Sequence, residues 1–515
     1  MMLPDRIDGV FAGAARDMPD HVHLVLTDGR EISYGETYAR AASLAGAFRS
    51  AGIIKGDRVA CFMRNSREIV EFFIACGIAN VIGVAINTMS MAREVERIFD
   101  DCGPTGIVAE NQFLEQVPNG PALAAMHLRV ATHMPSPPDG WENYDMLVGH
   151  SDPAPQPVGA TRDDPAMMIY SSGTTGAPKG ILLSHRALVT DARMTLDVLQ
   201  MTSQDRFMTV LPMFSSFGFA FDFLQVGLLR ASVVILEQFE ERLAVEMIER
   251  FGVTFLAAVP TMLARMFDGT NIDGLNISSL RLIDVGGGPV SPRLKLMLSE
   301  DYGAQVVESY GLTEISPVAS VQVPGRDNPL GSCGPVLPGI ECRIVGFDGT
   351  PAKQGVPGEL QFASPTVMIG YWNQPELTAE TLKDGWLRTG DVGRIDEYGH
   401  IHILDRTKDM IVSNGFNVYP KEVENVIAEI PGVQSVAVVG SPDEIAGEII
   451  CVFIVLKPDE KLAGEKVLRH CAKTLSNYKR PKEVRFIDTM PLTGSGKIRR
   501  VHLRTMLGKD KDNIV

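Results

Sequence analysis

Short runs of apolar residues, many of them β-branched, alternate with longer amphipathic stretches over the first three-fifths of the chain. Residues 58–63, 231–237 and 280–286 are typical of buried strands, whereas residues 66–75 and 240–251 are typical of helices. Strands that alternate with helices predict an α/β fold with a substantially parallel sheet.

The pattern changes twice towards the C-terminus. After about residue 317, short strands separated by Gly and Pro predict a small β-barrel-like subdomain. Beyond residue 405, a helix at 420–429, strands at 433–439 and 449–455, and a helix at 465–475 predict a small α+β domain. The expected fold is therefore a large N-terminal domain of α/β subdomains plus the barrel-like part, followed by this small domain.

Composition narrows the class of protein. A chain of 515 residues is too long for one ordinary core, and 45% hydrophobic with 22% charged residues is normal for a soluble globular protein. The net charge of −15 argues against a protein that binds nucleic acid over its whole surface. Residues 461–515 carry 14 Lys or Arg against 5 Asp or Glu, so an acidic body ends in a basic tail. That tail is either a solvated face, a nucleic-acid contact without a recognition motif, or a region that meets phosphates.

Cysteine usage and hydropathy favour a cytoplasmic protein. The seven cysteines are scattered without CxxC pairs, which suits a reducing compartment and suggests no zinc site. The N-terminus has no apolar signal region. The most apolar stretch, residues 207–236, is interrupted by Pro212, Asp222 and Arg230, so we expect no transmembrane segment.

A glycine-rich segment at residues 171–180 reads SSGTTGAPKG and lies between the apolar runs 167–170 and 181–183. Strand, loop, strand is the predicted local structure. Its glycines allow backbone N–H groups to turn inward, its hydroxyls add donors, and Lys179 adds a positive charge. The segment is neither a Walker A motif nor a GxGxxG motif. It predicts a polyphosphate-binding loop; a flexible surface loop is the alternative interpretation.

This segment resembles the signature of the adenylate-forming superfamily, which contains acyl-CoA synthetases, luciferases and nonribosomal peptide adenylation domains. Further motifs similar to those of the superfamily follow in the same order over nearly the whole chain. The resemblance implies that ATP phosphates are bound by Ser171, Ser172, Gly173, Thr174, Thr175 and Lys179.

Two further motifs imply the rest of the nucleotide site in the large domain. In YGLTE, residues 310–314, Glu314 matches a magnesium ligand and Thr313 a phosphate contact, and both are expected to be catalytic. Mg²⁺ normally takes one or two protein carboxylates beside phosphate oxygens. The GGGP of residues 286–289 follows a strand and offers backbone without side chains to a flat ligand. Without the other motifs, Glu314 could equally be an exposed glutamate and residues 286–289 an ordinary tight turn. The resemblance implies adenine and substrate contacts at Gly287, Gly288, Glu308, Ser309 and Tyr310.

The last third of the chain carries the other implied site residues. In RTGD, residues 388–391, Asp391 resembles a carboxylate that accepts from both ribose hydroxyls, and Arg406 resembles a second ribose or phosphate contact. Lys408 matches the hinge, which divides the chain into domains 1–407 and 408–515. Gly415 matches a glycine of the CoA tunnel, although Asn414 replaces a glycine of many relatives. Lys497 resembles the catalytic adenylation lysine.

Residues 211–223, LPMFSSFGFAFDF, correspond to the acyl-pocket segment of the superfamily. They contain no Lys or Arg to hold a second carboxylate, which favours an apolar acid over a dicarboxylate or an amino acid. The expected acyl-pocket residues are Phe214, Ser215 and Phe219, with Gly288. Many relatives have His where this chain has Ser215, and the choice between aliphatic and aromatic acids stays open.

The resemblance implies an AMP-forming acyl-CoA synthetase that uses ATP, Mg²⁺ and CoA. The enzyme would form an acyl adenylate from a small-molecule carboxylic acid and then transfer the acyl group to the CoA thiol. Two alternatives remain: a ligase that loads a separate carrier protein, and a binding homologue without catalysis. Luciferase-like oxidation has no support in the motifs. We expect no nucleic-acid partner. A homodimer is one possible assembly of the chain.

Overall fold

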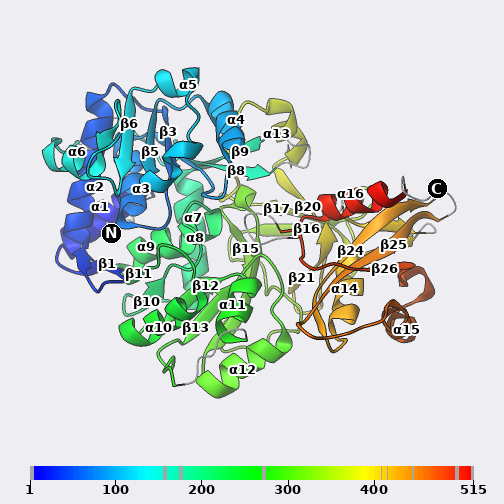
Figure 1. Cartoon of the computed structure of the whole chain (residues 1–515). Coiled ribbons are helices and arrows are strands. Elements are labelled where there is room, and N and C mark those ends of the chain that lie inside the picture. Colours follow the sequence, from blue (N-terminus) through cyan, green and yellow to red (C-terminus); the bar gives the residue numbers. More distant parts are fainter. Residues whose placement is uncertain are drawn as a thin grey trace. The chain divides into compact units, whose positions relative to one another are not determined.

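The computed structural model of the chain describes residues 5–154, 159–172, 178–268, 274–406, 409–413, 416–443, 446–492 and 498–511. Its internal contacts define two compact units (Figure 1). The N-terminal unit comprises Met1–Cys342 and Phe362–Leu387, and the C-terminal unit comprises Arg343–Gln361 and Arg388–Val515. Lys408 lies outside the described residues, so the division at that residue stays a prediction.

One eight-stranded sheet of the N-terminal unit has the strand order β15-β14-β13-β12-β10-β11-β1-β2. Its pairs from β14 to β1 are parallel, and its two edge pairs are antiparallel. The strands are β1 (Val22–Leu26), β2 (Glu31–Ser33), β10 (Arg206–Met208), β11 (Ser232–Ile235), β12 (Phe255–Ala258), β13 (Leu282–Val285), β14 (Gln305–Gly311) and β15 (Val318–Val321).

The second eight-stranded sheet has the order β18-β9-β8-β4-β3-β5-β6-β7. It is parallel except where β9 pairs with β8 and with β18. The strands are β3 (Arg58–Phe62), β4 (Ile82–Ala85), β5 (Gly106–Glu110), β6 (Leu128–Thr132), β7 (Glu142–Asn143), β8 (Pro165–Ser172), β9 (Pro178–Ser184) and β18 (Gly370–Tyr371).

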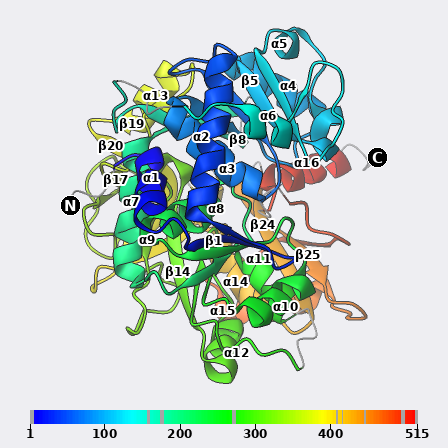
Figure 2. The same ribbon diagram turned by 90° about the vertical axis from the view of Figure 1, so that its left-hand side faces the viewer.

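Helices cover both sheets, as the alternating pattern predicts. Helices α10 (Glu241–Phe251), α11 (Pro260–Phe267) and α12 (Pro292–Tyr302) bury apolar side chains on one face of the first sheet. In the second sheet, Gly83 of β4 faces Phe72 and Phe73 of α3. Figure 2 shows α3 beside α1 and α2. The remaining helices of this unit are α1 (Ile7–Asp17), α2 (Tyr34–Ser50), α3 (Arg67–Ala79), α4 (Ala92–Cys102), α5 (Pro121–Ala124), α6 (Tyr144–His150), α7 (His185–Leu199) and α13 (Pro375–Thr381).

A largely buried helical segment runs through the N-terminal unit. It consists of α8 (Ser216–Gly218), a π-helical stretch (Phe219–Gln225) and α9 (Val226–Leu229). Every side chain of the π-helical stretch is buried. Phe219 contacts Phe73 of α3, whereas Phe221 stacks on Phe255 of the first sheet, with ring centroids 4.9 and 6.0 Å apart respectively. Because this helix meets apolar partners on several sides, its sequence is apolar nearly all round.

The β-rich region forms a five-stranded sheet of order β16-β17-β20-β19, with β21 beside β20. A second five-stranded sheet, of order β23-β22-β25-β24 with β26 beside β25, lies in the C-terminal unit. The strands of the two sheets are β16 (Glu341–Val345), β17 (Gly358–Ala363), β19 (Leu382–Lys383), β20 (Trp386–Ile395), β21 (Ile401–Arg406), β22 (Ile411–Ser413), β23 (Phe416–Val418), β24 (Val433–Asp443), β25 (Gly447–Leu456) and β26 (Glu483–Phe486).

Helices α14 (Pro420–Ala428) and α15 (Gly464–Thr474) pack on one core of the C-terminal unit, and α16 (Arg500–Lys511) packs on another. The predicted elements of this region are thus confirmed, with ends shifted by four residues at most. Over the described residues, no helix is long and apolar enough to cross a membrane.

Candidate active site

The predicted phosphate loop connects two paired strands. In β8 and β9, Ser171 lies opposite Lys179 and Ser172 opposite Pro178, so the two ends of the loop meet across an antiparallel ladder. Helix α7 then begins with Ser184 as its cap, since the Ser184 side chain accepts a hydrogen bond from the Ala187 N–H. The strand, loop, strand prediction is confirmed. Gly173, Thr174 and Thr175 lie outside the described residues.

Glu314 and Thr313 lie in a 3₁₀ turn, Thr313–Ile315, directly after β14. The Thr313 hydroxyl lies 3.0 Å from the Ser216 hydroxyl at the start of α8. The Tyr371 hydroxyl of β18 donates a hydrogen bond of 2.9 Å to Glu314 Oε1. Lys179 Nζ lies 5.7 Å from the centroid of the same tyrosine ring. The structure therefore brings the cation of the phosphate loop and the carboxylate of YGLTE to one aromatic side chain.

The Tyr371 hydroxyl is a stable donor in this position. Burial, and then the nearby Glu314 carboxylate, raise the pKa of Tyr371 well above its usual value. The hydroxyl therefore stays protonated at neutral pH.

Glu308 lies on β14 next to the glycine-rich turn and has structural partners. Its carboxylate accepts from Lys295 Nζ at 2.8 Å and from the Val290 N–H at 3.2 Å. These bonds hold the segment that follows GGGP. Ser309, the next residue, donates to Asp284 Oδ2 at 3.0 Å. Burial raises the pKa of Asp284 to about 7.

The glycine-rich turn comes close to the start of the buried helix. A Cβ at Gly286 would lie 2.9 Å from the Phe217 ring, and Gly287 has φ +80°, so both positions require glycine. A Cβ at Gly288 would make ordinary contact with Pro260. The backbone of this turn therefore faces an aromatic ring, as a pocket wall requires. Tyr310 is half-buried at the far end of β14.

The expected acyl-pocket residues differ in their surroundings. Phe214 and Ser215 are partly exposed, and Ser215 caps α8 by accepting from the Gly218 N–H. Phe219 is fully buried against Phe73 and Phe223 and has the contacts of a core residue. Phe217, another phenylalanine of the predicted acyl-pocket segment, is the ring beside Gly286.

In the C-terminal unit, Asp391 of β20 lies opposite Arg406 of β21. Arg406 Nε is 3.1 Å from Asp391 Oδ1, and the carboxylate is nearly buried whereas the guanidinium is half-exposed. The Asp391 N–H donates to the Thr389 hydroxyl within the same motif. The structure thus brings together the two residues expected at the ribose. Gly415 and Lys497, like Lys408, lie outside the described residues.

The residues present fit magnesium held together with a nucleotide. Among the described residues, no three His, Cys, Asp or Glu side chains form a cluster that could hold a metal by themselves. Glu314 offers one carboxylate, and the adjacent residue Thr313 offers a hydroxyl that contacts the Ser216 hydroxyl. Mg²⁺ is commonly bound by so few protein ligands when phosphate oxygens supply the others.

The sequence pattern did not indicate Tyr371 as a site residue. Ser216 and Phe217 lie in the predicted acyl-pocket segment, but their contacts with Thr313 and Gly286 were not predicted. Each contacts an expected site residue, but Tyr371 is 57 positions from Glu314, and Ser216 is 97 positions from Thr313. The only local signal was the sequence GYW at residues 370–372, directly after a short apolar run.

Within the N-terminal unit, Lys179 and Glu314 meet at Tyr371, and within the C-terminal unit Asp391 pairs with Arg406, so each unit brings together residues that the superfamily resemblance implies. The chain belongs to the family described as AMP-binding enzymes, which matches residues 11–372, and its C-terminal domain model matches residues 422–497. It is a ligase of the adenylate-forming superfamily, as the resemblance predicts.

Individual relatives agree with this class. Indoleacetate–CoA ligase of Aromatoleum aromaticum is 34% identical over 483 residues, which cover 93% of this chain and 94% of the relative. The fatty acid–[acyl-carrier-protein] ligase ScoC of Streptomyces coeruleorubidus is 33% identical, with 93% and 92% covered. The structure of the anthranilate CoA ligase AuaEII in complex with anthranoyl-AMP is similar with a TM-score of 0.91 at 27% identity, over 99% of each chain.

Proposed function

We propose that the protein is an AMP-forming acyl-CoA synthetase for a compact, mainly apolar carboxylic acid. The observation that carries this proposal is the meeting of Lys179 and Glu314 at Tyr371. A lysine at the exit of a phosphate loop can neutralise the charge of the ATP phosphates. A nearby carboxylate can hold the Mg²⁺ ion that these phosphates bind.

The first half-reaction converts a poor electrophile into a good one. A carboxylate oxygen of the acid attacks the α-phosphorus of ATP, the bond from that phosphorus to the β-phosphate oxygen breaks, and pyrophosphate leaves. Ser171, Ser172 and Lys179, with the loop between them, would hold the phosphates, and Thr313 would contact them. Asp391 and Arg406 would bind the ribose, and Lys497 would stabilise charge at the α-phosphate.

Magnesium would be held by Glu314 and would neutralise charge on the phosphate oxygens. The adenine would lie against Gly287 and the backbone of residues 308–310. The glycine-rich turn at residues 286–288 supports this proposal because its backbone carries no side chains.

In the second half-reaction the CoA thiol attacks the acyl carbon, AMP leaves, and the thiol proton is released. The proposed roles of the C-terminal residues are those that the superfamily implies. The segment after Lys408 would rotate, Lys497 would leave the site, and Gly415 would enter it to line the pantetheine tunnel.

The acid is proposed to be aromatic. Phe219 and Phe223 are in contact with each other, with ring centroids 4.8 Å apart, and Phe217 with Phe221 at 4.9 Å. Phe219, Phe221 and Phe223 are core residues, whereas Phe217 is partly exposed beside Gly286. An aromatic ring at this position would suit a compact aromatic acyl group. Two relatives are named for the aromatic acids indoleacetate and anthranilate, whereas ScoC is named for a fatty acid, so the acid panel must contain both classes.

A carrier-protein thiol is the second candidate acceptor, because one relative is named as an acyl-carrier-protein ligase. The deciding experiment measures pyrophosphate and AMP release over a panel of aromatic and aliphatic acids, with and without CoA, and identifies the thioester by mass spectrometry. We expect CoA-dependent AMP release with an acyl-CoA product. AMP release that is indifferent to CoA with every acid would favour the carrier protein, and no pyrophosphate release with any acid would indicate a binding homologue.

A further inference from the structure

A short segment of the N-terminal unit, residues 368–373, links the two halves of the proposed nucleotide site. We call it the bridging segment. The Met368 N–H donates to the Glu314 carbonyl at 2.8 Å. On the other side, the Ile369 N–H donates to the Leu182 carbonyl and the Trp372 N–H to the Gly180 carbonyl, at 2.8 and 2.7 Å. The segment is therefore hydrogen-bonded both to the turn with Glu314 and to the strand that leaves the phosphate loop.

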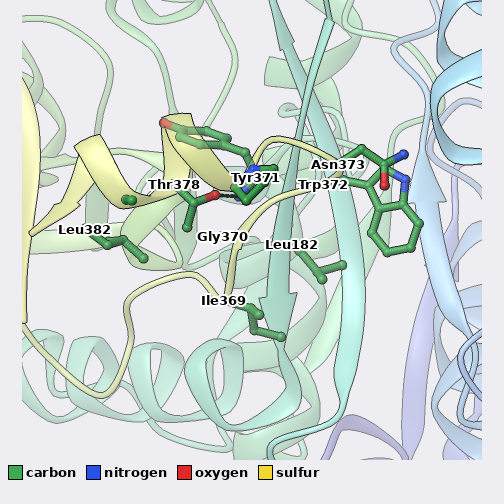
Figure 3. Close-up of a pocket in the computed structure, with 10 residues that line it drawn as sticks. Leu182, Ile369, Gly370, Tyr371, Trp372, Asn373, Thr378 and Leu382 are labelled. Atoms are coloured by element: carbon green, nitrogen blue, oxygen red, sulfur yellow. Dashed lines mark hydrogen bonds between the residues drawn. The ribbon is translucent and has the colours of Figure 1, made fainter.

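The bridging segment is itself firmly held. The Tyr371 N–H donates to Thr378 Oγ1 of α13 at 2.9 Å, and Trp372 Nε1 donates to the Asp101 carbonyl at 3.1 Å. Gly370 has φ +157°, and a Cβ there would lie 2.8 Å from Thr378 Cγ2. Figure 3 shows the Tyr371 and Trp372 side chains pointing in different directions. Tyr371 thus stands on a backbone with little freedom.

Tyr371 contacts one group from each half of the site. Its hydroxyl donates to Glu314 Oε1, and its ring lies beneath Lys179 Nζ. A carboxylate that accepts at one oxygen keeps the other oxygen in a defined direction. An ammonium group is also attracted to the face of an aromatic ring. One side chain can therefore orient both charged groups before the nucleotide binds.

We propose that Tyr371 is a positioning residue that holds the Glu314 carboxylate ready for the divalent cation and sets the position of Lys179 at the exit of the phosphate loop. This inference rests on the proposed function, in which Glu314 holds Mg²⁺. The hydrogen-bond partners of metal-ligating carboxylates matter for metal affinity because they fix the ligand's orientation.

The test uses the full-length protein and Mn²⁺ as a paramagnetic probe in place of Mg²⁺. Binding of Mn²⁺ is titrated by electron paramagnetic resonance in the presence of α,β-methylene-ATP, which cannot release pyrophosphate. Tyr371→Phe should weaken Mn²⁺ binding about tenfold, because it removes the hydroxyl donor and keeps the ring. Its affinity for the analogue without metal should stay at the wild-type value. Tyr371→Leu should also lower the affinity for the analogue without metal, because the aromatic ring that positions Lys179 is then absent.

Two further variants separate positioning from a general loosening of the segment. Trp372→Phe removes one hydrogen bond from the same segment without contacting Glu314, and it should leave Mn²⁺ affinity unchanged. In a Glu314→Gln background, Tyr371→Phe should have little further effect on Mn²⁺ binding, because the two residues act as one unit.

The proposal is overturned if Tyr371→Phe binds Mn²⁺ as the wild type does, or if Trp372→Phe weakens binding equally. It is also overturned if the Tyr371 and Glu314 effects simply add. Failure of the proposed function would be seen differently, as a wild-type protein that releases no pyrophosphate with any acid. The Mn²⁺ titration needs no turnover and decides the role of Tyr371 in either case.

Discussion

Arg406 Nε lies 3.1 Å from Asp391 Oδ1 across the paired strands β20 and β21. The two residues are direct register partners, so the strand pairing itself creates the ion pair. A nearly buried carboxylate beside a half-exposed guanidinium offers an acceptor for a diol together with a cation for a phosphate.

Asp391→Ala should therefore weaken AMP binding about tenfold, since a charged acceptor of two hydrogen bonds is lost. Calorimetric titration with AMP measures this directly. Arg388→Ala is the matched control, because Arg388 forms a different ion pair, with Glu359 at 3.2 Å. If both variants bind AMP equally well, Asp391 does not contact the ribose.

Lys497→Ala should abolish pyrophosphate release while sparing thioester formation from supplied acyl adenylate. The ammonium group would act only where charge develops at the α-phosphate. Quenched-flow assays of each half-reaction give the comparison. Equal loss in both half-reactions would refute the assignment of Lys497 to adenylation alone.

Gly415→Leu should have the opposite effect, because a side chain at this position would obstruct the proposed pantetheine tunnel. We expect normal pyrophosphate release from ATP and acid, with slow transfer of the acyl group to CoA. An unaffected CoA step would show that the tunnel lies elsewhere.

Phe217 and Phe219 should respond differently to truncation, although they are two positions apart. Phe219→Ala should lower the free energy of unfolding by about 3–5 kcal/mol, because it removes a fully buried ring. Phe217→Ala should destabilise less and should instead change the ratio of kcat/KM values over the acid panel, since this ring lies at Gly286. Urea unfolding and the acid panel test the pair. The opposite assignment of stability and specificity would contradict the pocket proposed here.

The stability of the N-terminal unit should depend on His133. The neighbouring carboxylates of Glu110 and Glu68 raise the pKa of His133 to about 10. The imidazole Nδ1 and Nε2 lie 3.6 and 3.3 Å from these carboxylates, which also face Arg64 and Arg67. Because the pKa of His133 is higher in the folded than in the unfolded protein, the protonated imidazole stabilises the fold. This stabilisation is complete below the unfolded pKa of about 6.5 and is lost as the pH rises through about 10.

His133→Gln should thus destabilise the protein most at pH 6, with a penalty that shrinks towards pH 10. Urea unfolding of both proteins at pH 6, 8 and 10 gives the measurement. A penalty that does not change with pH would mean that the charged imidazole contributes nothing through these carboxylates.

Sequence by itself determined the element types, the order of the motifs and the class of enzyme. Periodicity identified β3, α3 and α10, and α14, β24, β25 and α15 of the C-terminal unit, because a strand or helix depends on residues a few positions apart. The glycine-rich segment between two apolar runs likewise identified the β8–β9 hairpin.

Only the tertiary structure decided which side chains meet. Phe217 and Phe219 look alike in the sequence, yet one lies at the glycine-rich turn and the other in the core, because their directions depend on how the buried helix packs. Tyr371 reaches Glu314 only because β18 pairs with β9 and the backbone of the bridging segment also bonds to the turn after β14. Local sequence patterns carry no information on such contacts, since they arise from the pairing of strands far apart in the chain.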